Sequence, residues 1–187
     1  MDFEQAVFSR RSIRAFTNQD VTKEQVDKLI AYGHCAPSGG NLKEWRFIVV
    51  RSEEGKHKLT EATYSGNKET NTPQQWLKTA PVIIAVVADH RPVMKRYGRR
   101  ALDELLYLDC GSAVENMLLG AVHMGLASCF ISGFREHEMA EALGLPEYMQ
   151  PIALLPVGYA AGPGVLRPTV PPEEVTYYET YQPRGEA

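Results

Sequence analysis

The chain has 187 residues, of which 44% are hydrophobic and 23% charged, and its formal net charge is −3. This length and composition predict one well-buried domain over residues 1–187. The mildly acidic balance lacks the broad positive field on which non-specific nucleic-acid binding depends, so we expect no nucleic-acid partner.

The three cysteines, Cys35, Cys110 and Cys129, form no C-x-x-C pair and are odd in number. Their spacing encodes neither a disulfide framework nor a zinc site, which favours a reducing, cytoplasmic setting. The N-terminus lacks the basic and apolar regions of a signal peptide, and the chain contains no run of about 18 apolar residues. We therefore expect a cytoplasmic protein with no bound metal and no membrane association.

Two helices are predicted in the N-terminal part of the chain. The first runs over residues 3–9, with Asp2 as its cap. The apolar side chains that we expect to face the core from this helix are Phe3, Val7 and Phe8. The second helix begins at a capping-box pattern of Thr22 and Gln25 and ends before a Pro-Ser-Gly-Gly break, so residues 37–41 fall on a loop.

Alternating helices and strands are predicted over the rest of the domain. The strands are expected at 45–50, 82–88, 126–131 and 152–157, and the helices at 53–63, 100–124 and 135–143. The helix at 100–124 is apolar on more than one face, as a central helix buried on most sides would be. Residues 64–75 are polar and predict a loop.

The last part of the chain, residues 162–187, is rich in proline, glutamate and tyrosine and lacks helical periodicity. It predicts an extended C-terminal arm. Tyrosine rings such as Tyr177, Tyr178 and Tyr181 are costly to leave in water, so the arm should pack on another surface, such as a second subunit. The alternative is a tail that lies on its own domain.

Three arginines and a serine follow the first helix: Arg10, Arg11, Ser12 and Arg14. Guanidinium groups offer forked N–H donors that suit a phosphate dianion, and they stay charged at any working pH. This cluster is a candidate phosphate site. The alternative is an ordinary solvated face that complements the C-terminal end of a helix.

Two further segments offer polar contacts for a flat ligand. The loop at 37–41 allows close approach of the backbone, and the Asn41 amide both donates and accepts. Ser132 and Gly133 come just after a strand and before a helix, so their backbone N–H groups are expected to point at a ligand. The chain has no P-loop, no nucleophile elbow, no H-E-x-x-H motif and no separate dinucleotide-binding turn.

These segments, in order and spacing, resemble the FMN-dependent nitroreductase family. The motifs that carry the resemblance are Arg10-Arg11-Ser12-Ile13-Arg14-Ala15-Phe16, Ala36-Pro37-Ser38-Gly39-Gly40-Asn41 with Trp45-Arg46-Phe47, Gly125-Leu126-Ala127-Ser128-Cys129-Phe130-Ile131-Ser132-Gly133-Phe134, and Leu155-Pro156-Val157-Gly158-Tyr159. The resemblance implies an α+β fold: a three-layer α-β-α sandwich around a mainly antiparallel sheet. It also implies a homodimer with two FMN sites at the interface and domain-swapped C-terminal arms.

The resemblance also implies which residues bind the cofactor. Arg10, Ser12 and Arg14 would hold the phosphate, ribityl chain and pyrimidine edge, and Arg11 matches the family motif. Pro37, Ser38, Gly39 and Asn41 would reach the ring, with the Pro-Ser-Gly part coming from the other subunit. The backbone at Ser132 and Gly133 would lie near flavin N5, which accepts hydride from NADH or NADPH before a small-molecule electron acceptor takes the place of the nicotinamide.

The chain departs from the family pattern at two places. Lys43-Glu44-Trp45 stands where many members have Gln-Pro-Trp, which leaves the substrate preference open. Near the C-terminus, Arg167 is the remaining candidate for a further phosphate contact, and the alternative for it is a solvated arginine on the arm. The side chains suited to cover the substrate are Trp76, Arg96, Tyr97, Arg99 and Arg100, although the basic ones among them equally fit an ordinary surface.

Three functions follow from this interpretation. The first is an FMN-dependent oxidoreductase that takes hydride from NAD(P)H and reduces nitroaromatics, quinones or a related acceptor by a ping-pong mechanism. The second is a reductive dehalogenase or a flavin-consuming enzyme of the same superfamily. The third is a non-enzymatic flavin-binding sensor.

Overall fold

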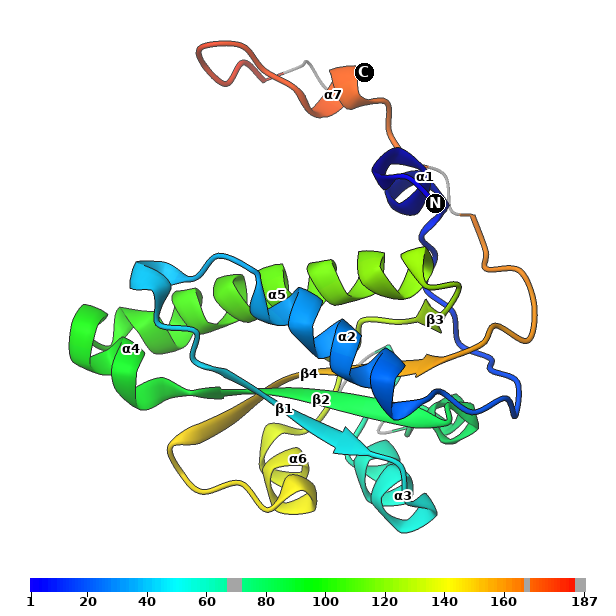
Figure 1. Cartoon of the computed structure of the whole chain (residues 1–187). Helices are drawn as coiled ribbons and strands as arrows, with labels where there is room; N and C mark the ends of the chain where they lie inside the picture. The colour runs from blue at the N-terminus through cyan, green and yellow to red at the C-terminus, as the bar shows by residue number, and fades with distance from the viewer. Residues whose placement is uncertain (67–71, 167–168, 184–187) are drawn as a thin grey trace.

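The structure is a computed structural model that describes residues 1–66, 72–166 and 169–183. A sheet lies between two layers of helices, with α5 and α2 on one face and α3 and α6 on the other (Figure 1). In chain order the elements are α1 Phe3–Ser9, α2 Lys23–His34, η1 Gly39–Asn41, β1 Trp45–Val50, α3 Glu53–Glu61, η3 Gln75–Thr79, β2 Val82–Asp89, α4 His90–Tyr97, the π-helical turn η4 Ala101–Leu105, α5 Leu106–His123, β3 Ala127–Ser128, α6 Glu136–Leu143, β4 Met149–Gly158 and α7 Pro172–Val175.

The described strands form one sheet in the order β1-β2-β4-β3, and every neighbouring pair is antiparallel. All eight residues of β2 are buried, because helices cover both faces of this central strand. The α+β class, the three layers and the antiparallel sheet predicted from the sequence are therefore confirmed.

Side-chain alternation along β2 divides the core into two clusters. Val82, Ile84 and Val86 face the α2 and α5 layer, where they join Leu29 and Met117. The intervening Ile83 and Ala85 face the other layer, where they pack with Leu59 of α3 and Met139 of α6. The sheet is thus held in place on both faces, and its ends and the loops beyond them are left to build a site.

The predicted helix starts are confirmed by their caps. The Asp2 side chain accepts a hydrogen bond from the Gln5 N–H at 2.8 Å, and Thr22 and Gln25 form a reciprocal capping box at the start of α2. The expected inward face of α1 is wrong for the single chain, because Phe3 and Phe8 are each 74% exposed and Ala6 is the buried residue of this helix.

The helix predicted at 100–124 is divided in the structure. A π-helical turn, η4, precedes α5, and a separate helix, α4, occupies residues that the sequence did not identify as helical. The stretch Leu102–His123 is long and apolar enough to cross a membrane by length and composition, but Cys110, Ala113 and Met117 of α5 are buried in the core. The third strand is shorter than expected, because residues beyond Ser128 leave the ladder and Ile131 pairs with Leu154 by an isolated bridge.

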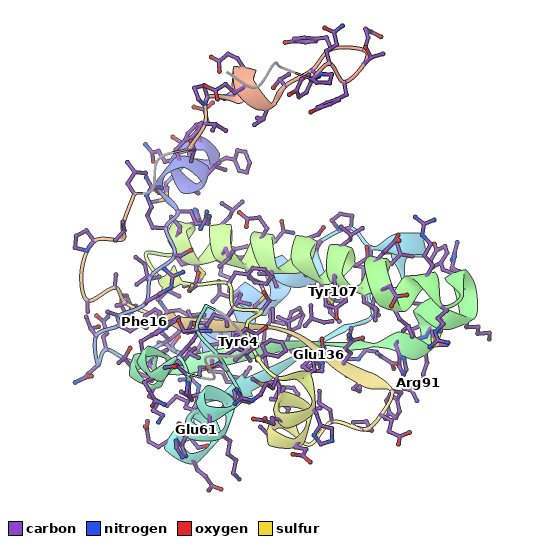
Figure 2. The ribbon with its side chains drawn as sticks, turned by 180° about the vertical axis from the view of Figure 1, so that it is seen from behind. Phe16, Glu61, Tyr64, Arg91, Tyr107 and Glu136 are labelled. Atoms are coloured by element: carbon purple, nitrogen blue, oxygen red, sulfur yellow. The ribbon has the colours of Figure 1, made fainter. Side chains whose placement is uncertain are left out.

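The C-terminal segment runs past α1 and extends away from the sheet and its covering helices (Figure 1). Its side chains project without cover from the rest of the domain (Figure 2), and Tyr178 is 84% exposed. Within the arm, the rings of Tyr177 and Tyr181 lie 4.6 Å apart. The predicted extended shape is present. Residues 162–166 lie beside the segment that follows α1, where Gly164 is next to Arg11 and Ile13, and residues 172–183 extend away from the domain (Figure 1).

Candidate functional site

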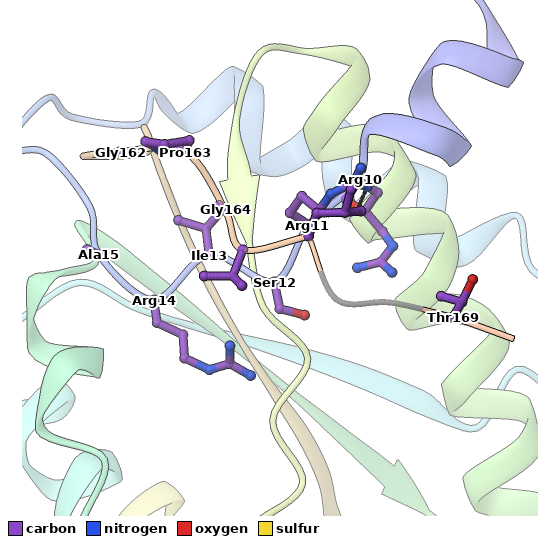
Figure 3. Close-up of a pocket in the computed structure, with 12 residues that line it drawn as sticks. Arg10, Arg11, Ser12, Ile13, Arg14, Ala15, Gly162, Pro163, Gly164 and Thr169 are labelled. Atoms are coloured by element: carbon purple, nitrogen blue, oxygen red, sulfur yellow. Dashed lines mark hydrogen bonds between the residues drawn. The ribbon is translucent and has the colours of Figure 1, made fainter.

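The segment after α1 is fixed along the edge of the sheet. Ser12 pairs with Ser128 of β3 by a parallel bridge, and the Ile13 N–H donates to the Ser128 carbonyl at 3.0 Å. A cavity of about 620 Å³ opens beside this segment (Figure 3), within the range of roughly 300–1,000 Å³ that is usual for small-ligand sites. Its lining residues are Arg10, Arg11, Ser12, Ile13, Arg14 and Ala15 on one side and Gly162, Pro163, Gly164, Val165, Leu166 and Thr169 on the other.

The three arginines of this segment have different environments. The Arg11 guanidinium donates to the Phe8 and Arg10 carbonyls, each at 2.7 Å, so it satisfies the C-terminal end of α1. Arg10 lies 3.8 Å from the Glu115 carboxylate in a partly exposed ion pair. The Arg14 guanidinium lies 6.0 Å from the centre of the Trp76 ring, the outer limit of a cation–π contact. Arg10 and Arg14 are therefore the cations best placed to meet an anion in the cavity.

A second cavity of about 460 Å³ shares Arg14 with the first. It is lined by Tyr64, Ser65, Gly66, Gln74, Cys129, Phe130, Ile131, Ser132 and Gly133 together with Arg14. Within the described residues, no hydrogen bond engages the backbone N–H of Ser132 or of Gly133. These two N–H groups border the cavity, where they can donate to a ligand.

A hydrogen-bonded network fixes the peptide at Gly133. The Gly133 carbonyl accepts from the Tyr64 N–H at 3.0 Å and from the Gln74 side chain at 3.4 Å. The Gln74 side chain also donates to the Tyr64 carbonyl at 3.0 Å, and the Gln74 backbone N–H donates to the buried Thr63 hydroxyl at 2.9 Å. Sequence reasoning missed Thr63 and Gln74, because the loop pattern around them gives no signal of a contact with Gly133, 59 residues away from Gln74.

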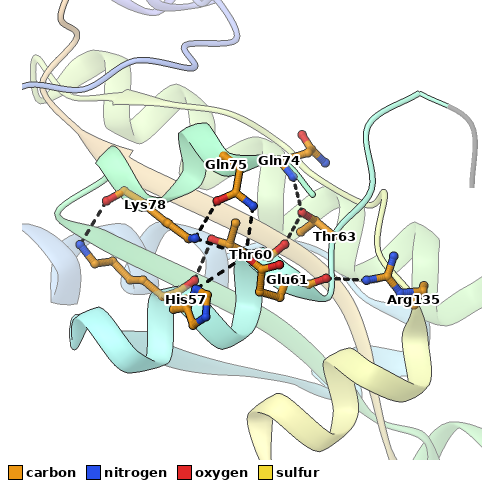
Figure 4. A network of polar contacts seen from close by, with 9 residues as sticks. His57, Thr60, Glu61, Thr63, Gln74, Gln75, Lys78 and Arg135 are labelled. Carbon is orange, nitrogen blue, oxygen red and sulfur yellow. Dashed lines mark hydrogen bonds and ion pairs between the residues drawn. The ribbon is translucent and has the colours of Figure 1, made fainter. Parts of the chain in front are cut away.

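The same loop is anchored to α3 and α6 by a polar cluster around Glu61 (Figure 4). The Glu61 carboxylate accepts from Gln75 at 3.0 Å and from Lys78 at 3.2 Å, and these bonds hold its pKa below the ordinary value. The Arg135 guanidinium donates to the Glu61 carbonyl and to the Glu138 carboxylate. The second cavity is thus bordered by loops that are tied to both helices of this layer.

The loop at 37–41 lies elsewhere in the chain. It is close to α4 and the start of α5, whereas the arginine segment lies beside β3 (Figure 1). The Gly39 N–H donates to the Asp109 carboxylate at 2.8 Å, and the Lys43 N–H donates to the Ser38 hydroxyl at 3.0 Å. Arg96 and Tyr97 of α4 lie against Gly40 and Gly39.

The backbone of this loop is unusual. Gly40, Asn41 and Lys43 all have φ between +48° and +58°, in the left-handed region that is unfavourable for residues other than glycine. Residues in such conformations persist when their surroundings hold them, and such positions cluster at ligand sites. The loop is therefore a second candidate surface for a ligand.

A buried acid lies next to this loop. The Glu44 side chain is fully buried, and neither carboxyl oxygen has a hydrogen-bond partner within the described part of the chain. Burial, together with the neighbouring Asp109, raises the pKa of Glu44 to about 7. Burial also raises the pKa of the Cys110 thiol, with further contributions from Glu44 and Asp109.

The structure therefore brings together some of the predicted site residues and separates others. The group that borders the two cavities is Arg10, Arg11, Ser12, Arg14, Ser132 and Gly133. The second group, Pro37, Ser38, Gly39 and Asn41, lies on the loop near α4 in the same chain. Trp76 accompanies the first group, and Arg96 and Tyr97 accompany the second. Arg167 lies outside the described residues.

Comparisons with known proteins show which family the chain resembles. The profile of the Nitroreductase family matches residues 7–159. A protein of Archaeoglobus fulgidus, provisionally named NADH dehydrogenase/NAD(P)H nitroreductase, is 30% identical over 92% of this chain and 87% of its own length. An FMN reductase [NAD(P)H] of Bacillus subtilis is 29% identical over 91% of this chain and 71% of its own length.

Structural similarity extends over almost the whole chain. The crystal structure of a nitroreductase family protein from Clostridium difficile 630 is 28% identical, covers 97% of this chain and all of its own, and superposes with a TM-score of 0.79. In sequence, human iodotyrosine deiodinase 1 is 27% identical over 84% of this chain and 61% of its own length. The chain belongs to the nitroreductase family.

Proposed function

We propose that this protein is an FMN-dependent oxidoreductase that uses NAD(P)H to reduce a small electron acceptor. The observation that carries the proposal is the pair of adjoining cavities that share Arg14. One cavity offers guanidinium and hydroxyl donors for a phosphate, and the other offers two backbone N–H groups, unpaired within the described part of the chain, for a ring. The names of two relatives, both FMN reductases of Bacillus subtilis, support the same cofactor and reductant.

The residues present suit a flavin mononucleotide. Arg10, Ser12 and Arg14 would hold the phosphate and the ribityl chain, and the backbone N–H groups of Ser132 and Gly133 would donate to the ring edge near N5. When bound, FMN supplies the hydride chemistry, because it accepts two electrons from a nicotinamide and passes them on. The role of the chain itself would be to bind and orient the ring through these residues.

The separation of the two groups of site residues supports a homodimer. Within one chain the loop at 37–41 lies near α4, so it would complete the site of a second subunit. The apolar side chains of α1 and of the arm are exposed, as in Phe3, Phe8 and Tyr178, and an interface would bury them. We infer a cytoplasmic homodimer in which the C-terminal arms embrace the partner.

The purified protein provides a direct test. Its visible spectrum is recorded, NADH or NADPH is added without oxygen in a stopped-flow cell, and a nitroaromatic or a quinone follows. Bleaching of the flavin band and its recovery with acceptor are expected. Bound flavin that neither nicotinamide reduces would favour a sensor, and failure to bind FMN would contradict the proposal.

Arg14→Ala tests the phosphate contact within that assay. Loss of a hydrogen bond to a charged group costs about 1.5–3 kcal/mol, so FMN affinity should fall by at least about tenfold. Arg91→Ala is the matched control, because Arg91 pairs with Asp89 at 2.6 Å and stacks on Tyr148 at 3.6 Å, away from the two cavities. Equal affinities of the two variants would count against a role for Arg14.

Reductive dehalogenation is the second candidate, because iodotyrosine deiodinases are among the relatives. The same reduced protein is mixed with an iodotyrosine, and iodide release is measured beside nitroaromatic reduction. Iodide release faster than reduction of every nitroaromatic and quinone tested would favour the dehalogenase.

A further inference from the structure

Glu44 is a buried ionisable group that the proposed function leaves unused. It immediately precedes β1, and its backbone is fixed because the Asp89 N–H donates to the Glu44 carbonyl at 2.9 Å. Its side chain is 0% exposed, and both carboxyl oxygens lack a partner within the described residues. A buried carboxylate without a donor is costly, so this arrangement needs an explanation.

The charges around Glu44 come from two elements. Asp109 and Cys110 lie on α5, and Arg46 lies on β1. The Arg46 guanidinium is engaged by the Lys43 and Trp45 carbonyls at 3.1 and 2.7 Å. The near neighbour that can share a proton with Glu44 is therefore Asp109, whose carboxylate also accepts from the Gly39 N–H.

Two ionised carboxylates cannot hydrogen-bond to each other, because both only accept. If Glu44 carries a proton, its O–H donates to Asp109, both acids are satisfied, and Asp109 stays ionised toward Gly39. The burial of Glu44 favours this neutral form. Asp109 is only partly buried, so it is the member of the pair that can turn toward water when Glu44 loses the proton.

The consequence reaches the loop at 37–41. Gly40, Asn41 and Lys43 are held in left-handed conformations, and the bond from Gly39 to Asp109 is one of the restraints on that shape. We propose that Glu44 is a positioning residue: in its protonated form it keeps Asp109 on the Gly39 N–H, so that the loop keeps the shape that a flavin ring requires. This inference rests on the proposed function for the loop.

The test compares wild-type protein with Glu44→Gln and Asp109→Asn. In Glu44→Gln the amide donates to Asp109 at every pH, and in Asp109→Asn the new amide donates to an ionised Glu44. FMN affinity is measured by fluorescence quenching from about pH 6 to about pH 8.5. The phosphate of FMN itself loses its second proton at about pH 6, which changes the affinity of every variant alike. The readout is therefore the FMN affinity of each variant divided by that of the wild type at the same pH.

The wild type should lose about tenfold in FMN affinity relative to Glu44→Gln over this range, the equivalent of one hydrogen bond. Asp109→Asn should follow Glu44→Gln, and Glu147→Gln, an exposed glutamate, should follow the wild type. Parallel profiles of the wild type and Glu44→Gln would overturn the inference.

A second readout does not depend on flavin. Amide hydrogen exchange in the peptide that contains Gly39 is followed in wild type and Glu44→Gln without FMN. Protection at Gly39 should fall in the wild type relative to the variant as the pH rises, and equal protection would overturn the inference. Failure to bind FMN with this exchange pattern present would contradict the proposed function alone.

Discussion

Replacing Glu44 by glutamine should change how stability depends on pH. The pKa of this carboxyl rises from 4.5 to about 7 on folding, a difference of about 2.5 units. A change of one in pKa corresponds to about 1.36 kcal/mol, so protonation of Glu44 contributes about 3 kcal/mol to the free energy of unfolding. Because the folded pKa is the higher one, this stability is fully present below about pH 4.5 and is lost as the pH rises through about 7.

Glutamine does not titrate. The free energy of unfolding of Glu44→Gln, relative to that of the wild type, should therefore increase by about 3 kcal/mol between about pH 4.5 and about pH 8.5. Urea unfolding at fixed protein concentration and without added FMN gives the free energy of unfolding at each pH. Glu147→Gln, on an exposed surface, provides the matched control. A constant difference between wild type and Glu44→Gln at all pH values would refute the reasoning.

Two further predictions concern the core and the second cavity. Leu154→Ala should cost about 2–5 kcal/mol in urea unfolding with an unchanged slope, because Leu154 of β4 is buried in the cluster between the sheet and the α3–α6 layer. Met94→Ala, on the surface of α4, should cost less than about 0.5 kcal/mol. Gln74→Leu removes the side-chain donor to the Tyr64 and Gly133 carbonyls, which fixes the peptide at Gly133. Flavin reduction in the stopped-flow cell should therefore slow by about fivefold or more. An unchanged rate would show that the network does not position Gly133.

Local sequence signals predicted most of the elements. The caps at Asp2 and Thr22 mark helix starts, and the apolar run at 82–88 marks the central strand, because these patterns act over a few neighbouring residues. The helix α4 was missed, since it is short, basic and contains Pro92, and Val93 is its one buried residue. The division of the helix at 100–124 was missed as well, because a π-helical turn leaves no mark in hydrophobic spacing.

Exposure of the apolar face of α1 could not be read from the sequence of one chain. Periodicity shows that Phe3 and Phe8 prefer burial, but it does not say against what. The same is true of the arm. Its tyrosines predict that a surface covers them, but they do not identify whether that surface belongs to the same chain or to a second subunit. Both segments are candidates for burial by a second subunit, which the solution mass of the protein would reveal.

The candidate site contains residues that would contact a ligand and residues that fix the backbone behind them. The sequence identified the first kind and not the second. Glycine, serine and arginine at the ligand surface recur as short motifs, because backbone approach and phosphate binding require those residue types. The groups that fix the backbone behind them, Gln74 for Gly133 and Asp109 for Gly39, act from 59 and 70 residues away. Many polar residues could serve at such distances, so only the folded geometry identifies them, and mutations there should alter ligand orientation before they alter the fold.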